Sequence, residues 1–218
     1  MPKRTPTIRP PQQERSRASF ERVLDAGARL LEEEGYEAFT LGEVSRRAKA
    51  SIGSIYGRVK RKDDLIHAIH LRLMDEMEAE AATAIAASEA ERLPTHELIA
   101  EAVREFADST RRHARLLSVF MHRAAVDAAI AAAGSAASRR VGRRFEDLIL
   151  ARRDEIVQPD PERAVDVAFR MVYCTLTRQI MYGPTFESDR AIGWDDLVDQ
   201  LTVACTFYLL GQSRSDAS

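Results

Sequence analysis

Apolar residues recur along most of the chain at intervals of three and four, with charged and polar residues between them. This spacing is typical of helices that bury one face and expose the other. The first such segment runs from Arg17 to Gly35, and glycine is common just past a helix end. No segment shows the regular alternation that a half-buried β-strand requires. The pattern therefore predicts an all-α protein.

Two short helices joined by a tight turn are predicted next. Thr40 followed by Glu43 is a capping box, in which the hydroxyl accepts an amide hydrogen bond and the carboxylate reaches back. The helix that begins there ends near Ala48. Ser51 is a second capping residue and predicts a helix through about Arg58. Together these segments predict a helix-turn-helix, whose last helix enters the major groove of DNA.

The later segments predict a larger helical body. Asp63 and Asp64 suit the first turn of a long helix, because the N-terminal end of a helix dipole favours negative charge. That helix continues into the Ala-rich region 79–90. Five further helices are predicted, one opening at Pro94 and the others at about 116–125, 127–156, 162–182 and 194–211.

Charge is distributed unevenly between the two ends of the chain. Residues 1–62 carry 14 Lys and Arg against 8 Asp and Glu, whereas the remainder carries 18 against 26. A basic head beside an acidic body indicates that the head meets a polyanion. The predicted organisation is a flexible basic arm at 1–14, a helix-turn-helix domain at 15–62 and a helical body at 63–212.

The segment after the turn meets the physical requirements of a groove-binding helix. Ile55 and Val59 have the spacing to anchor it against the first two helices. Tyr56 can place its hydroxyl on a phosphate. The residues that let the backbone approach base edges are Ser51, Ile52, Ser54 and Gly57. The positive charges beside the duplex would be Arg58, Lys60, Arg61 and Lys62.

The stretch FTLGEVSRRAKASIGSIYGRVKRKDDL, Phe39 to Leu65, resembles the DNA-binding segment of the TetR family of bacterial transcriptional regulators. The resemblance covers about residues 15–70 and implies a three-helix head on a body that binds an effector and dimerises. It implies a ligand-responsive regulator, most often a repressor that a small apolar or amphipathic effector releases from double-stranded DNA. It also implies phosphate contacts by Thr40, Tyr56 and Lys62, and a groove-facing set of Ile52, Ser54, Gly57 and Arg58.

Three positions depart from the usual pattern of the family. Lys49 stands where glycine is frequent, so a left-handed backbone there is expected to cost energy. Arg58 stands where histidine is frequent, and the sequence leaves open whether it bonds a guanine edge or a phosphate. Arg61 replaces a frequent serine, so the fourth helix is expected to lose a cap.

A single small head makes few contacts, so a homodimer that reads two half-sites is expected. The last two helices are apolar over a wide arc, which predicts burial on more than one side. The expected interface residues are Ala168, Met171, Thr175, Leu201, Ala204 and Tyr208. The alternative is that these helices are buried entirely within one subunit.

The resemblance also implies an effector pocket in the body, which the sequence itself supports only by scattered apolar residues. The candidate lining residues are Phe106, Phe120, Met121, His122, Phe145, Tyr173 and Arg178, with Met74, Met77, Phe169, Gln179 and Tyr182 as further possibilities. Each of these apolar residues would serve equally well as ordinary core.

Two other functions stay open, a helical module that binds an acidic protein and a helical metal-dependent enzyme. A carboxylate-bridged metal site needs Glu-x-x-His pairs, and none occurs among the five histidines. We therefore expect no catalysis, no cofactor and no metal. Cys174 and Cys205 lie in apolar helical patterns and are expected to be free. The longest uncharged run, 200–213, is too short to cross a bilayer, so a cytoplasmic protein without membrane association is expected.

Overall fold

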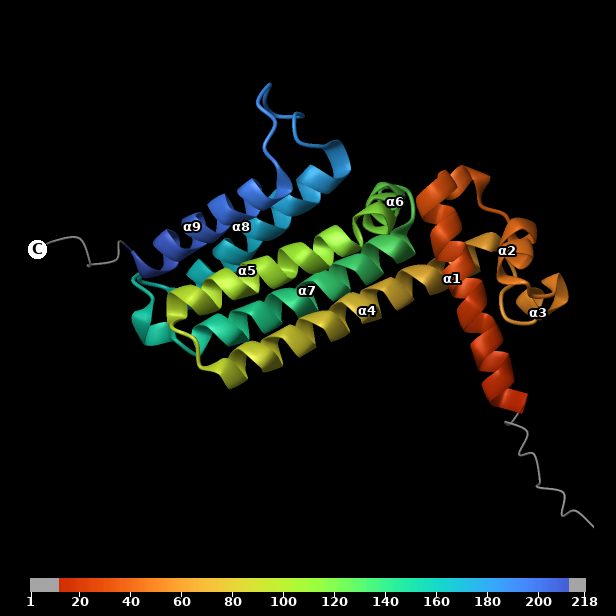
Figure 1. Cartoon of the computed structure of the whole chain (residues 1–218), viewed down its shortest axis with the longest axis horizontal. Coiled ribbons are helices and arrows are strands. Elements are labelled where there is room, and N and C mark those ends of the chain that lie inside the picture. Colours follow the sequence, from red (N-terminus) through yellow and green to blue (C-terminus); the bar gives the residue numbers. More distant parts are fainter. Residues whose placement is uncertain (1–11, 212–218) are drawn as a thin grey trace, which may run out of the picture. The chain divides into compact units, whose positions relative to one another are not determined.

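Helices make up all the regular secondary structure in residues 12–211, which are the part of the chain that the computed structural model describes (Figure 1). The side chains of residues 12–15 and 88–91 are not part of that description. The all-α prediction is confirmed. Most of the predicted arm, residues 1–11, lies outside the described residues, and the first helix already begins at Gln12.

The chain divides into two units, residues 1–70 and 71–218, and the division falls inside the fourth helix. The boundary predicted from the sequence, between residues 62 and 63, lies at the start of that helix. The helices are α1 (Gln12–Ala38), α2 (Leu41–Ala48), α3 (Ile52–Tyr56), α4 (Lys62–Glu91), α5 (Thr95–Arg112), α6 (Ala114–Ala124), α7 (Ala128–Leu150), α8 (Pro161–Tyr182) and α9 (Trp194–Leu210).

The first unit, called the head below, consists of α1, α2, α3 and the first turns of α4. Its centre is Phe39, which is fully buried in the short link between α1 and α2. Leu30 of α1, Val44 of α2 and Ile69 of α4 are also fully buried. Burial of a large aliphatic or aromatic side chain contributes roughly 1.5–3 kcal/mol, so these few residues hold the short helices in place.

Local capping sets the ends of the short helices. Thr40 Oγ1 accepts a hydrogen bond from the Glu43 amide at 3.2 Å, and Ser51 Oγ accepts one from the Ser54 amide at 3.2 Å. Only half of the predicted capping box forms, because the Glu43 carboxylate bonds arginines instead. Lys49 adopts the left-handed conformation expected from its position, with φ 49° and ψ 41°. A non-glycine residue there costs about 1 kcal/mol.

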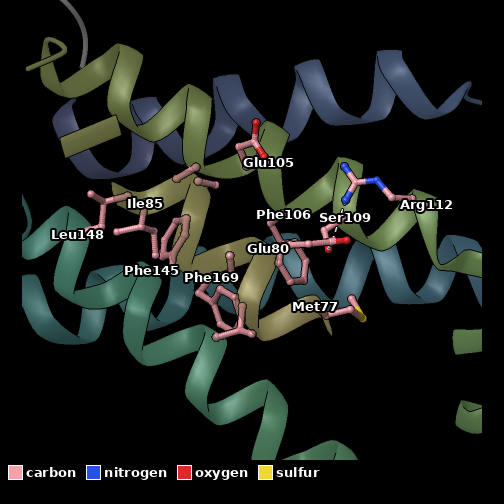
Figure 2. A pocket seen from close by; sticks show the side chains of 14 residues that line it. Met77, Glu80, Ile85, Glu105, Phe106, Ser109, Arg112, Phe145, Leu148 and Phe169 are labelled. Carbon is pink, nitrogen blue, oxygen red and sulfur yellow. Dashed lines mark hydrogen bonds and ion pairs between the residues drawn. The ribbon is translucent and has the colours of Figure 1, made fainter. Parts of the chain in front are cut away.

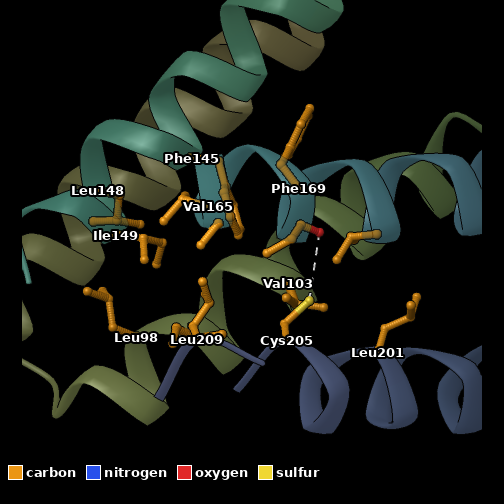
Figure 3. Packing of buried hydrophobic residues seen from close by; sticks show 14 of the residues in the cluster. Leu98, Val103, Phe145, Leu148, Ile149, Val165, Phe169, Leu201, Cys205 and Leu209 are labelled. Carbon is orange, nitrogen blue, oxygen red and sulfur yellow. Dashed lines mark hydrogen bonds between the residues drawn. The ribbon is translucent and has the colours of Figure 1, made fainter. Parts of the chain in front are cut away.

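The second unit, called the body below, contains the rest of α4 and helices α5 to α9. Its core is apolar and brings together α5, α7, α8 and α9 (Figure 3). Ile99, Ile149, Val165 and Leu209 are fully buried in it. Cys205 lies beside the backbone of α8, with its Sγ 3.8 Å from the carbonyl oxygen of Ala168. Burial raises the pKa of the Cys205 thiol to about 11.

The seventh helix is shorter than its sequence pattern predicts. Residues up to Ile156 were expected to be helical, but α7 ends at Leu150 and is followed by a turn and a short 3₁₀ helix, Arg153–Glu155. The reason is that contacts with distant segments end the helix early. Ile156 is buried in the core, and the amide of Val157 donates to the carbonyl of Leu209 at 2.9 Å, so the chain must leave the helix to reach α9.

Within residues 12–211, no helix combines the length and the apolar composition that crossing a membrane would require. The described side chains also contain no group of three or more His, Cys, Asp or Glu residues placed to hold a metal ion.

Candidate DNA-binding surface and effector cavity

The third helix is anchored by two residues and is otherwise exposed. Ile55 is fully buried and Val59, just after the helix, is 6% exposed. Every other position from Ser51 to Lys60 is exposed, including Ile52 at 42%. The exposed side of α3 carries small side chains at Gly53 and Ser54. A helix with a thin outer face and a buried inner edge has the shape that a DNA groove requires.

The predicted phosphate-binding hydroxyls lie on the exposed surface of the head. Tyr56 is 56% exposed at the end of α3. Thr40 is exposed at the start of α2, where its Oγ1 accepts from the Glu43 amide. A hydroxyl that accepts one hydrogen bond still has its own hydrogen to donate, so Thr40 can cap the helix and contact a phosphate together. The N-terminal end of α2 adds the positive end of a helix dipole.

Arg58 is held against the first helix. Its guanidinium donates to Ser16 Oγ at 2.7 Å and lies 4.8 Å from the centre of the Phe20 ring. The sequence grouped Arg58 with the groove-facing residues Ile52, Ser54 and Gly57, and gave no sign of this contact across 42 positions. Arg58 is nevertheless exposed, and guanidinium has five N–H donors, so others stay available for DNA.

Lys62 also makes contacts within the head. Its Nζ lies 4.1 Å from the centre of the Tyr36 ring and donates to the Tyr36 carbonyl oxygen at 3.4 Å. The Tyr36 hydroxyl donates to Asp63 Oδ1 at 2.7 Å. The Lys62 ammonium therefore braces the end of α1 against the start of α4. The Lys62 amide belongs to the first turn of α4, where amides have no acceptor within the helix and can donate to an anion such as a phosphate.

The start of α4 is capped in a way that the sequence did not predict. Asp64 Oδ2 accepts hydrogen bonds from the amides of Lys60 at 2.9 Å and Arg61 at 3.0 Å. These two backbone bonds lower the pKa of the Asp64 carboxyl. The expectation that α4 loses its cap was wrong, because Asp64, a residue inside the helix, supplies the acceptor. The aspartate three residues after Arg61 was the sequence signal that could have predicted this cap.

A cluster around Arg47 joins α2 to the end of α1. Its guanidinium bonds the carboxylates of Glu33 and Glu34, and its Nε donates to Glu43 Oε1 at 2.8 Å. Arg46 also pairs with Glu43. Hydrogen bonds from Arg46 and then Arg47 lower the pKa of Glu43 to about 2, although burial opposes this shift. This cluster fixes α2 and leaves Lys49, Lys60 and Arg61 as exposed cations beside α3.

The body contains a cavity between α4, α5, α7 and α8 (Figure 2). It encloses about 680 Å³ of empty space, counting its opening to solvent. Three rings form its centre: the ring centres of Phe106 and Phe169 are 5.6 Å apart, as are those of Phe145 and Phe169. The other lining residues are Met77, Glu80, Ala81, Ala84, Ile85, Ala102, Glu105, Ser109, Arg112, Val141 and Leu148. An apolar lining with a few polar groups is typical of small-molecule sites.

A polar cluster closes one side of the cavity. The Glu80 carboxylate accepts from Ser109 Oγ at 2.6 Å, pairs with Arg112 at 2.7 Å and lies 3.1 Å from His113 Nε2. Burial raises the pKa of Glu80, but the hydrogen bonds from Ser109, His113 and Arg112 outweigh burial and the net shift is downward. This cluster joins α4 to the end of α5, and no pattern in the sequence predicted it.

Five of the seven predicted pocket residues lie outside this cavity. Phe106 and Phe145 do line it, as do Met77 and Phe169. The Tyr173 ring packs behind Phe106, at 6.1 Å between ring centres, and its hydroxyl bonds Ser138. The remaining four lie elsewhere: Phe120 is buried in α6, Met121 is half-buried beside it, His122 is exposed with its Nδ1 2.7 Å from the Ser118 carbonyl, and Arg178 stacks on Tyr182 and Phe186.

The last two helices expose an apolar face. Val203 and Phe207 of α9 are 47% and 54% exposed. Ala204 is exposed too, and the predicted interface residues Met171, Thr175 and Tyr208 are half-buried. Two of the predicted interface residues are corrected, because Ala168 is fully buried and Leu201 is only 9% exposed, and both belong to the core of the body.

Residues 23–69 match the family model described as bacterial regulatory proteins, tetR family. Residues 23–69 therefore form a DNA-binding domain of the TetR type. The matched segment runs from α1 to the first turns of α4 and therefore contains the whole candidate DNA-binding surface. The TetR assignment made from the stretch 39–65 is confirmed.

A curated transcriptional regulator is similar to this chain over a longer segment than the family model matches. A curated relative, an uncharacterized HTH-type transcriptional regulator YhgD of Bacillus subtilis, is 27% identical over 129 residues. The match covers 59% of this chain and 62% of the relative, so the chain spans less than two thirds of that protein's length.

Solved structures show the same fold over most of the chain. A TetR-family regulator from Mesorhizobium loti has a TM-score of 0.70 at 16% identity, covering 89% of this chain and 96% of its own. FadR from Bacillus subtilis, solved in complex with stearoyl-CoA, has a TM-score of 0.64 at 15% identity, covering 89% and 100%. At such identities these likenesses establish the TetR fold alone.

Proposed function

We propose that this protein is a DNA-binding transcriptional regulator that works as a homodimer on cytoplasmic DNA and represses transcription by occupying its operator. The observation that carries the proposal is α3, which is anchored by Ile55 and Val59 and exposes the rest of its surface. The cations beside it supply the sequence-independent attraction to phosphates. In this proposal the protein regulates transcription and none of its residues acts as a catalyst.

A dimer follows from the apolar face of α8 and α9. Met171 and Thr175 on α8, with Val203, Ala204 and Phe207 on α9, form an outward surface of mixed small and large side chains. A second copy of the same face would cover these residues by two-fold symmetry. Two heads then read two half-sites, which multiplies the contacts that one small head can make.

An effector in the cavity would control DNA binding. Any effector shifts the equilibrium only by its difference in affinity between the DNA-binding and the DNA-free arrangement. The cavity is bounded partly by α4, and the same helix begins in the head. A small apolar or amphipathic molecule that favours the DNA-free arrangement would therefore relieve repression.

The experiment that tests the proposal is selection of genomic DNA fragments by the purified protein, followed by gel-shift titration of the selected duplex. We expect retention against excess nonspecific DNA, since specific sites are typically bound more than about 10³-fold more tightly. If nonspecific DNA displaced the selected duplex without being in excess, the protein would not be a sequence-specific DNA-binding regulator. That result would favour a protein-interaction module.

Tyr56 offers a sharper test of the contact surface. Tyr56→Phe keeps the ring and removes the hydroxyl, so we expect about tenfold weaker binding to specific and nonspecific duplexes alike. Tyr182→Phe is the matched control, because Tyr182 is 48% exposed but lies in the body. If wild type and Tyr56→Phe bound DNA with equal affinity, the Tyr56 hydroxyl would not contribute a DNA contact.

A further inference from the structure

The charges that line the cavity do not balance. Glu80 and Glu105 contribute two carboxylates, and Arg112 contributes one guanidinium (Figure 2). With His113 neutral, these groups leave one net negative charge. With His113 protonated, they sum to zero. Neither state provides the excess positive charge that an anionic ligand would need.

The single guanidinium is already paired. Arg112 lies 2.7 Å from Glu80 Oε2, and the same carboxylate accepts from Ser109 Oγ and lies 3.1 Å from His113 Nε2. The Arg112 side chain is 54% exposed and keeps further N–H donors, but an anion bound there would also lie close to the Glu80 carboxylate. Glu80 already helps to raise the pKa of Glu105, so a further negative charge at this end of the cavity would add repulsion.

Glu105 differs from Arg112, because no hydrogen bond or ion pair from another described residue reaches its carboxylate. Burial raises the pKa of Glu105, and the like charges of Glu101 and Asp108 raise it further. Glu105 lies at the edge of the cavity lining on α5, where its side chain is exposed and, in Figure 2, is directed away from the phenylalanine rings. A positive group at this position would relieve repulsion without displacing any existing contact.

We propose that the effector of this cavity is an amphipathic cation, whose apolar part lies against Phe106, Phe145 and Phe169 and whose positive group lies at Glu105. The three rings favour the same class of ligand, because an aromatic face attracts a cation that passes over it. This inference rests on the proposed function, since it specifies the effector of the same regulator.

The test uses three probes that share one tail and differ in charge: octyltrimethylammonium, 1-octanol and octanoate. Their binding to the full-length protein is measured by calorimetry without DNA, below the concentration at which they form micelles. The variants are Glu105→Gln and Glu97→Gln. Glu97 lies on the same helix, two turns from Glu105, and does not line the cavity, so its substitution is the matched control.

We expect the ammonium probe to bind most tightly and octanoate most weakly. Glu105→Gln should weaken the ammonium probe by about three- to tenfold, leave octanol unchanged and not weaken octanoate. Glu97→Gln should leave all three affinities unchanged. Tighter binding of octanoate, equal effects of the two variants, or no binding of any probe would each overturn the proposal.

A separate measurement distinguishes this proposal from the proposed function. The selected duplex, labelled with a fluorophore, is titrated with the protein and its anisotropy is recorded before and after the ammonium probe is added. Failure to bind any duplex specifically contradicts the regulator function and leaves the calorimetric ranking intact. If the protein binds the duplex specifically but its cavity prefers octanoate, only the proposal of a cationic effector is overturned.

Discussion

At the scale of single residues, Arg58 shows how one contact changes an interpretation. The sequence left open whether this arginine reads a base or a phosphate. In the structure its guanidinium is fixed between Ser16 Oγ and the Phe20 ring, both on α1. We expect a guanidinium held against α1 in this way to contact the phosphate backbone and not the base edges.

Arg58→Ala is therefore expected to weaken binding to all duplexes by about three- to tenfold and to reduce the slope of log K against log salt by about one. Arg58→Lys keeps the charge and should keep the slope. Gel-shift titrations at several salt concentrations measure both quantities. A change of preferred base at one operator position, with the slope unaltered, would show that Arg58 reads sequence instead.

Glu43 carries a pH-dependent contribution at the same scale. Its pKa falls from 4.5 to about 2, chiefly through hydrogen bonds from Arg46 and Arg47. A carboxyl whose pKa is lowered by folding stabilises the folded state above its unfolded pKa and loses that contribution as pH falls. Helix α2, which contains Glu43 and both arginines, should therefore lose this stabilisation as pH drops from about 4.5 toward 2.

Hydrogen exchange of the α2 amides, corrected for intrinsic rates, measures this effect. Glu43→Gln removes the titrating group, so protection of α2 in this variant should be lower at neutral pH and depend less on acid. Parallel pH curves for wild type and Glu43→Gln would show that the Arg46 and Arg47 pairs do not stabilise the head.

At the scale of elements, two glycines in the head differ in what surrounds them. A Cβ added to Gly27 of α1 would lie 2.6 Å from Ile69 Cδ1 and 3.4 Å from the Phe39 ring. Ile69 and Phe39 are both fully buried, so neither has free space to move into. A Cβ added to Gly42 of α2 would meet nothing within 4 Å. Gly27 is thus required by helix packing, and Gly42 is not.

Gly27→Ala is expected to lower the free energy of unfolding of the head by about 1–2 kcal/mol, because overpacking exceeds the gain in helix propensity. Gly42→Ala should raise it by about 0.5 kcal/mol. Exchange protection of α1 and α2 amides reports both changes. The packing argument fails if the two variants shift stability in the same direction.

At the scale of the whole molecule, we expect the outward face of α8 and α9 to form the dimer interface. Phe207→Arg places a charge on this face, and a buried unpaired charge is costly at an interface. We expect at least about a tenfold rise in the dimer dissociation constant, measured by analytical ultracentrifugation. Phe207 is 54% exposed, so the subunit should remain folded.

Val126→Arg is the control, because Val126 is 74% exposed and lies outside α8 and α9. Circular dichroism of both variants verifies that the helices are retained. An unchanged dissociation constant for Phe207→Arg would show that the dimer interface lies on another surface.

The sequence by itself determined the local features of this protein. The caps at Thr40 and Ser51, the left-handed Lys49 and the anchors Ile55 and Val59 all follow from residues within a few positions of one another. Helix spacing and capping depend on hydrogen bonds three or four residues apart, which a linear pattern contains. For the same reason the motif over 39–65 identified the family correctly.

The tertiary structure alone decided every feature that joins distant segments. Helix α9 is apolar over so wide an arc that its sequence did not show whether Leu201 or Phe207 faces the core. The contacts of Arg58 with Ser16, and of Glu80 with Arg112, span 42 and 32 positions, and no local rule selects such partners. Side chains of similar chemistry compete for each position, and only the packing of whole helices determines which of them meet.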